Sequence, residues 1–90
     1  MSSIKNNSCP ACGYDLGFAS WVSSSPSDEI CPCCGIQYGY DDEAGGEISK
    51  RQFIYKEWKN RWIMEGMPWR SVGIRPPNNW DPFKQLKNLN

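Results

Sequence analysis

The sequence predicts a small α+β protein: three short strands around two cysteine pairs, then an amphipathic helix, an irregular segment rich in proline and tryptophan, and a short C-terminal helix. Two observations predict this order. The two pairs share one spacing, and after residue 47 the apolar residues change to a helical period. Because 90 residues suffice for one domain, we expect a single domain over residues 1–90, with residues 48–90 packed as a helical extension on residues 8–47.

Each cysteine pair encloses two residues and is followed by glycine, in Cys9-Pro10-Ala11-Cys12-Gly13 and Cys31-Pro32-Cys33-Cys34-Gly35. A pair with this spacing can place both sulfurs on one ion from a single tight turn, and twin pairs are typical of a tetrahedral zinc site. The chain contains no histidine, so we expect one structural zinc ion held by thiolates alone. The predicted ligands are Cys9, Cys12, Cys31 and Cys34.

Disulfides and a redox dithiol are the alternatives for these cysteines. The first seven residues are mostly polar and do not resemble a signal peptide, which predicts a reducing, cytoplasmic location. The sequence also lacks the βαβ pattern of a thioredoxin-like site. We therefore favour the metal.

The fifth cysteine, Cys33, aligns with Ala11 when the two pairs are superimposed. At this position the side chain is expected to point away from the ion, so we interpret Cys33 as a spare thiol. A reactive nucleophile is the alternative, but no histidine is present to activate it.

Short extended segments flank the second pair. Residues 16–22 read as a strand, residues 23–27 as a turn by composition, and residues 28–30 lead back to the cysteines. Residues 36–40 alternate apolar with polar or small side chains and predict a third strand. This order is the layout of a zinc ribbon.

The second half predicts a helix over residues 50–65. Trp58 and Trp62 recur at helical spacing, and Ser49 with Gln52 forms a capping box at the start. We expect both tryptophans to pack on the ribbon.

The remaining residues predict a long connection and a closing helix. Residues 67–80 contain three prolines and two tryptophans, and irregular segments of this length are usually functional or wrapped on the core. Asp81 followed by Pro82 is typical of a helix start, so a short C-terminal helix is expected.

The net charge of zero conceals a division, because residues 1–47 sum to −6 and residues 48–90 to +6. Much of this charge can be internal complementarity between the halves. An enzyme is not expected: four thiolates close the metal shell, and the commonest general base is missing. No apolar run is long enough for a bilayer, so no membrane association is expected.

Two functions fit this pattern. A protein-binding module is favoured by the separated charges and by aromatic and arginine side chains, which often dominate interfaces. The candidate partner contacts are Asp41, Asp42, Glu43, Glu47, Trp69, Arg70, Arg75 and Trp80. The alternative is a nucleic-acid-binding zinc ribbon that uses the basic helix and its tryptophans, although the acidic first half would repel phosphates.

The order of elements resembles that of small bacterial cysteine-rich proteins of the CPCC type over most of the chain. The residues that carry the resemblance are Ile30-Cys31-Pro32-Cys33-Cys34, Asp41-Asp42-Glu43, Gly45-Gly46 and Arg75-Pro76-Pro77. The chain departs from the type at Ala11, where a cysteine is expected, and has no tryptophan before the acidic pair. The resemblance implies a zinc-ribbon fold, in proteins sometimes found as partners of toxins.

Charge and this resemblance together suggest one particular kind of partner. A basic bacterial toxin or nuclease could receive the acidic residues Asp41, Asp42, Glu43 and Glu47 in its cationic site. The protein would then act as an immunity or antitoxin-like inhibitor.

Overall fold

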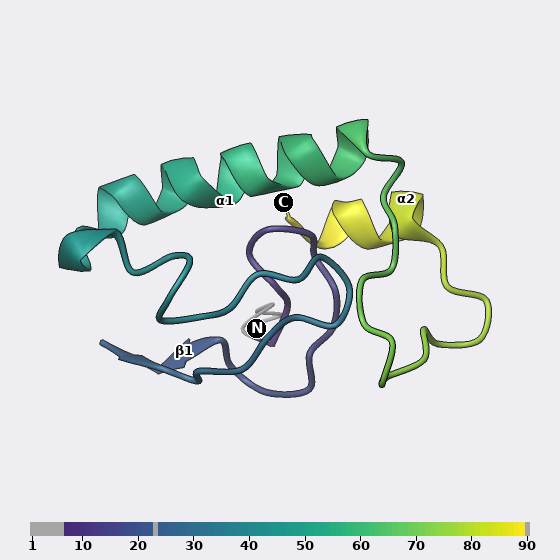
Figure 1. The fold of residues 1–90 in the computed structure, drawn as a ribbon, viewed down its shortest axis with the longest axis horizontal. Helices are drawn as coiled ribbons and strands as arrows, with labels where there is room; N and C mark the ends of the chain where they lie inside the picture. The colour runs from purple at the N-terminus through teal and green to yellow at the C-terminus, as the bar shows by residue number, and fades with distance from the viewer. Residues whose placement is uncertain (1–6, 23, 90) are drawn as a thin grey trace.

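The computed structural model describes residues 7–22 and 24–89. In chain order the described elements are β1 (Trp21–Val22), β2 (Ser25–Pro26), the 3-10 helix η1 (Ala44–Gly46), α1 (Ile48–Met64), α2 (Pro82–Leu86) and the 3-10 helix η2 (Lys87–Leu89). α1 lies along one side of the looped N-terminal half, and α2 follows the long connection at the far end of α1 (Figure 1). The predicted small α+β architecture is confirmed at this level.

The strands are shorter than the sequence predicts, and β2 lies within the predicted turn over residues 23–27. Within residues 16–22 only Trp21–Val22 is paired, antiparallel to Ser25–Pro26. Residues 36–40 contribute a single bridge, between Ile30 and Gln37, and then turn. The backbone amides of Tyr40 and Asp41 donate to the Gln37 carbonyl at 3.3 and 2.9 Å. The alternating pattern therefore reflects burial of Ile36 and Tyr38 against the cysteines, whereas Tyr40 is exposed, and the prediction of a third strand is wrong.

α1 begins at Ile48 and ends at Met64, close to the predicted range. The capping box is wrong, because the N-cap is Glu47, whose side chain makes no capping hydrogen bond, and Ser49 lies inside the first turn. Within the described residues no helix is both long and apolar enough to span a bilayer.

The tryptophans of α1 attach the helix to the N-terminal half, as predicted. Trp62 is 1% exposed within the buried cluster that contains the five cysteines, and its indole N–H donates to the Pro68 carbonyl of the following segment at 2.8 Å. Trp58 is half-buried and donates to the Cys34 carbonyl at 3.0 Å. The core thus forms between one face of α1 and the cysteine-bearing turns.

A buried carboxylate, Asp42, holds the first turns of α1 in place. Its oxygens accept hydrogen bonds from Trp21 Nε1 at 2.8 Å, Gly39 N at 2.6 Å and Tyr55 Oη at 2.5 Å. Arg51 Nε donates to the Asp42 carbonyl at 3.0 Å, and its guanidinium lies 3.8 Å from the centre of the Trp21 ring. A buried carboxylate is tolerated here because three donors replace its water.

The C-terminal segment packs on the first cysteine-bearing turn. Asp81 accepts hydrogen bonds from the amides of the first turn of α2, which confirms the predicted cap. Gln85 Nε2 then donates to the Cys12 carbonyl at 3.0 Å, and Asn88 Nδ2 to the Gly13 carbonyl at 2.9 Å. Two amide side chains therefore link residues that are more than 70 positions apart.

This contact predicts a difference between two glycines. Gly13 has φ +86°, and a Cβ there would lie 2.4 Å from the Gln85 carbonyl oxygen; Gly17 has φ +83° with nothing within 4 Å. Both alanine substitutions strain the backbone, but only Gly13→Ala also overpacks, so it is expected to cost about 1–3 kcal/mol more. Denaturant unfolding of both variants measures this, and equal losses would contradict the docking.

Candidate metal centre

The two cysteine-bearing turns have the same backbone hydrogen bonds, displaced by 22 residues along the chain. In the first knuckle, defined as residues 8–15, Gly13 N donates to Cys9 O at 2.8 Å; in the second, residues 30–37, Gly35 N donates to Cys31 O at 2.9 Å. One bridge closes each knuckle at its ends. Both glycines have φ near +85°, a conformation that side chains disfavour. Repetition in the sequence thus becomes repetition in the backbone.

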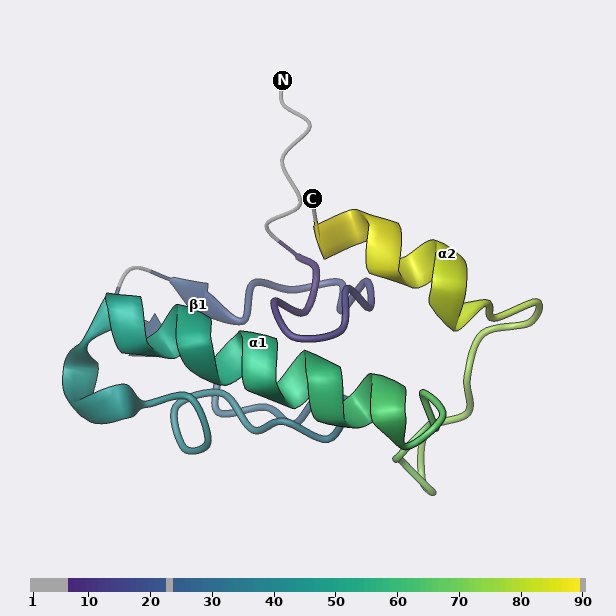
Figure 2. The same cartoon turned by 90° about the horizontal axis from the view of Figure 1, so that it is seen from above.

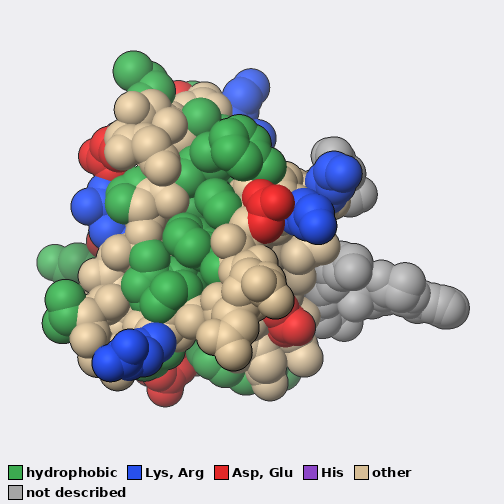
Figure 3. All heavy atoms as spheres, turned by 90° about the vertical axis from the view of Figure 1, so that its right-hand side faces the viewer, with side chains coloured by type: hydrophobic (Ala, Val, Ile, Leu, Met, Phe, Trp, Pro, Cys, Tyr) green, Lys and Arg blue, Asp and Glu red, His purple; other side chains and the backbone are tan. Residues whose placement is uncertain are grey.

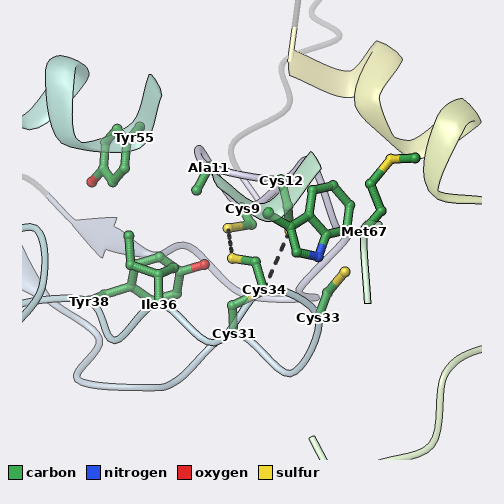
Figure 4. Packing of buried hydrophobic residues seen from close by; sticks show 11 residues of the cluster. Cys9, Ala11, Cys12, Cys31, Cys33, Cys34, Ile36, Tyr38, Tyr55 and Met67 are labelled. Carbon is green, nitrogen blue, oxygen red and sulfur yellow. Dashed lines mark hydrogen bonds between the residues drawn. The ribbon is translucent and has the colours of Figure 1, made fainter. Parts of the chain in front are cut away.

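The structure brings the four predicted ligands together. The sulfur atoms of Cys9, Cys12, Cys31 and Cys34 all lie within 4.8 Å of one another, and all four residues are buried. The contacts between the knuckles measure 3.8 Å from Cys9 to Cys34 and 3.7 Å from Cys12 to Cys31, as the dashed lines in Figure 4 show. The four thiols are free. They could therefore hold a metal ion.

The sulfurs share their charge unequally. Hydrogen bonds from Cys12, and then from the other two thiols, hold the pKa of Cys31 below its usual range. Hydrogen bonds with Cys31, and then with Cys33 and the other two thiols, raise the pKa of Cys12. Cys31 is therefore more readily deprotonated than Cys12.

Cys33 lies outside this cluster, as its alignment with Ala11 predicts. It is completely buried, and its sulfur accepts a hydrogen bond from Gln85 Nε2 at 3.3 Å. Figure 4 shows the sulfur turned away from the other four. Cys33 therefore belongs to the contact with α2.

The sequence reasoning missed Tyr38, which it placed only in a strand. The side chain is completely buried, and its hydroxyl is directed toward the sulfurs of Cys9 and Cys34 (Figure 4). Burial raises the pKa of Tyr38, and the charges of the nearby cysteines raise it further, so the phenol keeps its proton. The knuckle alignment was an available signal, because it places Tyr38 opposite Leu16.

The acidic residues are placed differently from the prediction. The prediction of Asp42 as a partner contact is wrong, because the residue is 0% exposed and its carboxylate already accepts hydrogen bonds from the loop and from α1. Asp41 is half-buried, and its carboxylate accepts a hydrogen bond from Gln37 N at 2.8 Å. Glu43 is exposed, and its carboxylate accepts a hydrogen bond from Gly45 N at 3.1 Å. Glu47 is exposed and lies 4.0 Å from a lysine nitrogen. Of the four acidic residues predicted as partner contacts, only Glu43 and Glu47 are exposed.

Trp69 and Trp80 are half-buried. Trp69 makes edge contacts of 5.2 Å between ring centres with Tyr14 and with Trp80. The indole N–H groups donate internally, from Trp69 to the Ile74 carbonyl and from Trp80 to Gln85, both at 2.7 Å. These rings therefore contribute first to the fold.

The eight candidate contacts do not form one surface. The acidic residues precede α1, whereas Trp69, Arg70, Arg75 and Trp80 follow it. The 17 residues of α1 span about 25 Å. Figures 1 and 2 show α1 running from the end that holds β1 to the end that holds residues 66–80.

Apolar side chains that sequence reasoning missed are exposed at this second end. Val72 is 104% exposed and Ile74 55%. Ile74 lines a groove of about 410 Å³ together with Ile30 and Pro32. Figure 3 shows hydrophobic side chains gathered across this side of the molecule. No sequence signal identified them, because an irregular segment has no period that separates inward from outward positions.

Comparison with family models, with curated proteins and with solved structures gave no match to this chain. The resemblance to CPCC-type proteins stays a prediction. Function is therefore inferred from the geometry of the molecule.

Two serine variants test the ligand assignment. We expect Cys34→Ser to lose most of its bound metal, because a hydroxyl replaces one of four soft ligands. Cys33→Ser should keep its metal, since a hydroxyl can still accept from Gln85. Metal per chain after dialysis against a weak chelator measures both, and equal loss in the two variants would contradict the assignment.

Proposed function

We propose that the chain is a non-enzymatic protein in which a structural zinc ion fixes a surface that binds another protein. Zinc–sulfur bonds of about 2.3 Å place the sulfurs of a regular tetrahedron about 3.8 Å apart. The contacts of 3.8 and 3.7 Å between the knuckles match this edge. Four thiolates are also a donor set that zinc favours, and they leave no position for water.

The observation that carries the binding proposal is the attachment of an exposed apolar segment to the second knuckle. Arg70 N donates to the Cys33 carbonyl at 3.1 Å, and Ser71 N to the Pro32 carbonyl at 2.9 Å. The exposed Val72 and Ile74 directly follow these bonds. A surface held in one conformation loses little entropy on binding, and exposed apolar groups are typical of interfaces.

The groove beside Ile74 has an acidic wall formed by Asp28 and Glu29; Arg70 also lines the groove, with its guanidinium paired to Glu65. This wall favours a partner that presents a basic residue next to an apolar one. An inhibitor of a basic toxin or nuclease is accordingly our more specific proposal, with the contact moved from the acidic loop to this groove.

Nucleic-acid binding has less support. The alternative needs free tryptophan faces, but Trp62 is 1% exposed and Arg61 lies over the Trp58 ring at 4.5 Å. Arg51 is engaged with Trp21 and the loop before α1. The basic helix therefore offers fewer stacking groups than its sequence suggests.

Metal content tests the first part of the proposal. We expect one zinc ion per chain, and loss of native structure around the knuckles when a strong chelator removes it, because structural zinc contributes on the order of 10 kcal/mol to folding. Elemental analysis and circular dichroism measure both effects. A chain that stayed folded with four titratable thiols and no metal would contradict it.

Paired surface variants test the second part. In affinity capture from source lysate with nuclease added, Val72→Ser with Ile74→Ser is expected to lose a protein that the wild type retains. Ile48→Ser with Phe53→Ser is the matched control, because these side chains are 68% and 64% exposed near the start of α1. Equal capture by both double variants would contradict the assigned surface, and capture abolished by nuclease would favour the nucleic-acid alternative.

A further inference from the structure

The hydroxyl of Tyr38 is the one buried side-chain nitrogen or oxygen in the described part of the chain that has no hydrogen-bond partner. The tyrosine is 0% exposed. By contrast, the hydroxyl of the other buried tyrosine, Tyr55, donates to Asp42 at 2.5 Å. A buried hydroxyl without a partner is costly, so such a group needs an explanation in a native fold.

Among the buried residues drawn in Figure 4, this hydroxyl faces cysteine sulfur atoms. Tyr38 directly follows the second knuckle, where its amide donates to the Glu29 carbonyl at 3.0 Å, and its ring turns inward. Figure 4 shows the hydroxyl directed at the pair formed by Cys9 and Cys34. A neutral thiol is a weak acceptor, whereas a thiolate is a strong one.

We propose that Tyr38 is a positioning residue of the metal centre, whose hydroxyl donates a hydrogen bond to the Cys9 thiolate when the ion is bound. The proposal rests on the zinc site proposed above and extends it to a residue outside the four ligands. A bound ion would keep Cys9 deprotonated. The Tyr38 hydroxyl would then have an acceptor, and its hydrogen bond would stabilise the negative charge on the sulfur. Four thiolates and one zinc ion carry a formal charge of −2 in a buried site, so such a donor is stabilising.

The centre becomes asymmetric as a result. The position equivalent to Tyr38 after the first knuckle is Leu16, which has no donor. The two knuckles share their backbone hydrogen bonds, so this side chain distinguishes them electrostatically. The sulfur that receives the hydroxyl is expected to be the less reactive toward oxidants and alkylating agents, because its lone pair is engaged.

The test uses cobalt(II) in place of zinc in the full chain, since charge transfer from thiolate to cobalt reports the energy of the sulfur lone pairs. Tyr38→Phe removes the donor and keeps the ring. We expect its charge-transfer band to move to lower energy and its affinity for cobalt and zinc to fall about 10- to 100-fold. Tyr55→Phe is the matched control, because its hydroxyl bonds Asp42 and not a sulfur. The control should lose stability without moving the band.

An unmoved band in Tyr38→Phe would overturn the proposal, whatever the change in affinity. A wild-type chain that shows no thiolate–cobalt band would overturn the proposed zinc site and this proposal together, which separates the two failures. A second measurement needs no variant: in the cadmium-113 form of the wild type, the Tyr38 hydroxyl proton should couple to the metal. Couplings from the cysteine β-protons without one from this hydroxyl would also overturn the proposal.

Discussion

The four-sulfur cluster is the constraint on which the rest of the structure depends. It joins two knuckles that are 22 residues apart, and each later segment attaches to a backbone carbonyl of those knuckles. α1 attaches through Trp58 to Cys34, the long connection through Arg70 to Cys33, and α2 through Gln85 to Cys12. A carbonyl can accept these bonds only where the knuckle holds it, so the positions of both helices follow from the geometry that places the sulfurs together.

Charge is used inside this molecule as well as on its surface. The sequence divides into an acidic and a basic half, and part of that division is internal. Asp42 from the acidic half accepts from Tyr55, and Arg51 from the basic half contacts Trp21 and the Asp42 carbonyl. A surface charge estimated from the sequence counts both groups, although the fold binds Asp42 with uncharged donors and holds Arg51 against a ring and a backbone carbonyl. The acidic loop is therefore a weaker docking site than its composition indicates.

The sequence predicted what depends on local spacing and failed where tertiary contacts decide. The two knuckles, α1 and the cap of α2 follow from periods and turn residues that act within a few positions, and the meeting of the knuckles follows from the repeated cysteine pair. The third strand failed because burial of Ile36 and Tyr38 beside the cysteines produces the same alternation as a ladder. The prediction for Asp42 failed for a related reason: an aspartate in a Gly-rich loop reads as solvated, and two of its three donors, Trp21 and Tyr55, come from segments distant in sequence. The role of Tyr38 likewise needs a three-dimensional neighbour.

The exposed segment after α1 is best understood as a consequence of the same attachments. Apolar side chains such as Val72 are usually driven into a core, and a free loop of this length could fold them inward. Here the two residues before Val72 donate their amides to knuckle carbonyls, and Ile74 N donates to Ser71 Oγ at 3.0 Å. Burying Val72 would break these bonds and leave the carbonyl of Cys33, a completely buried residue, without its partner. The exposure of this segment is thus imposed by the second cysteine-bearing turn, so the candidate metal centre and the proposed binding surface form one structural unit.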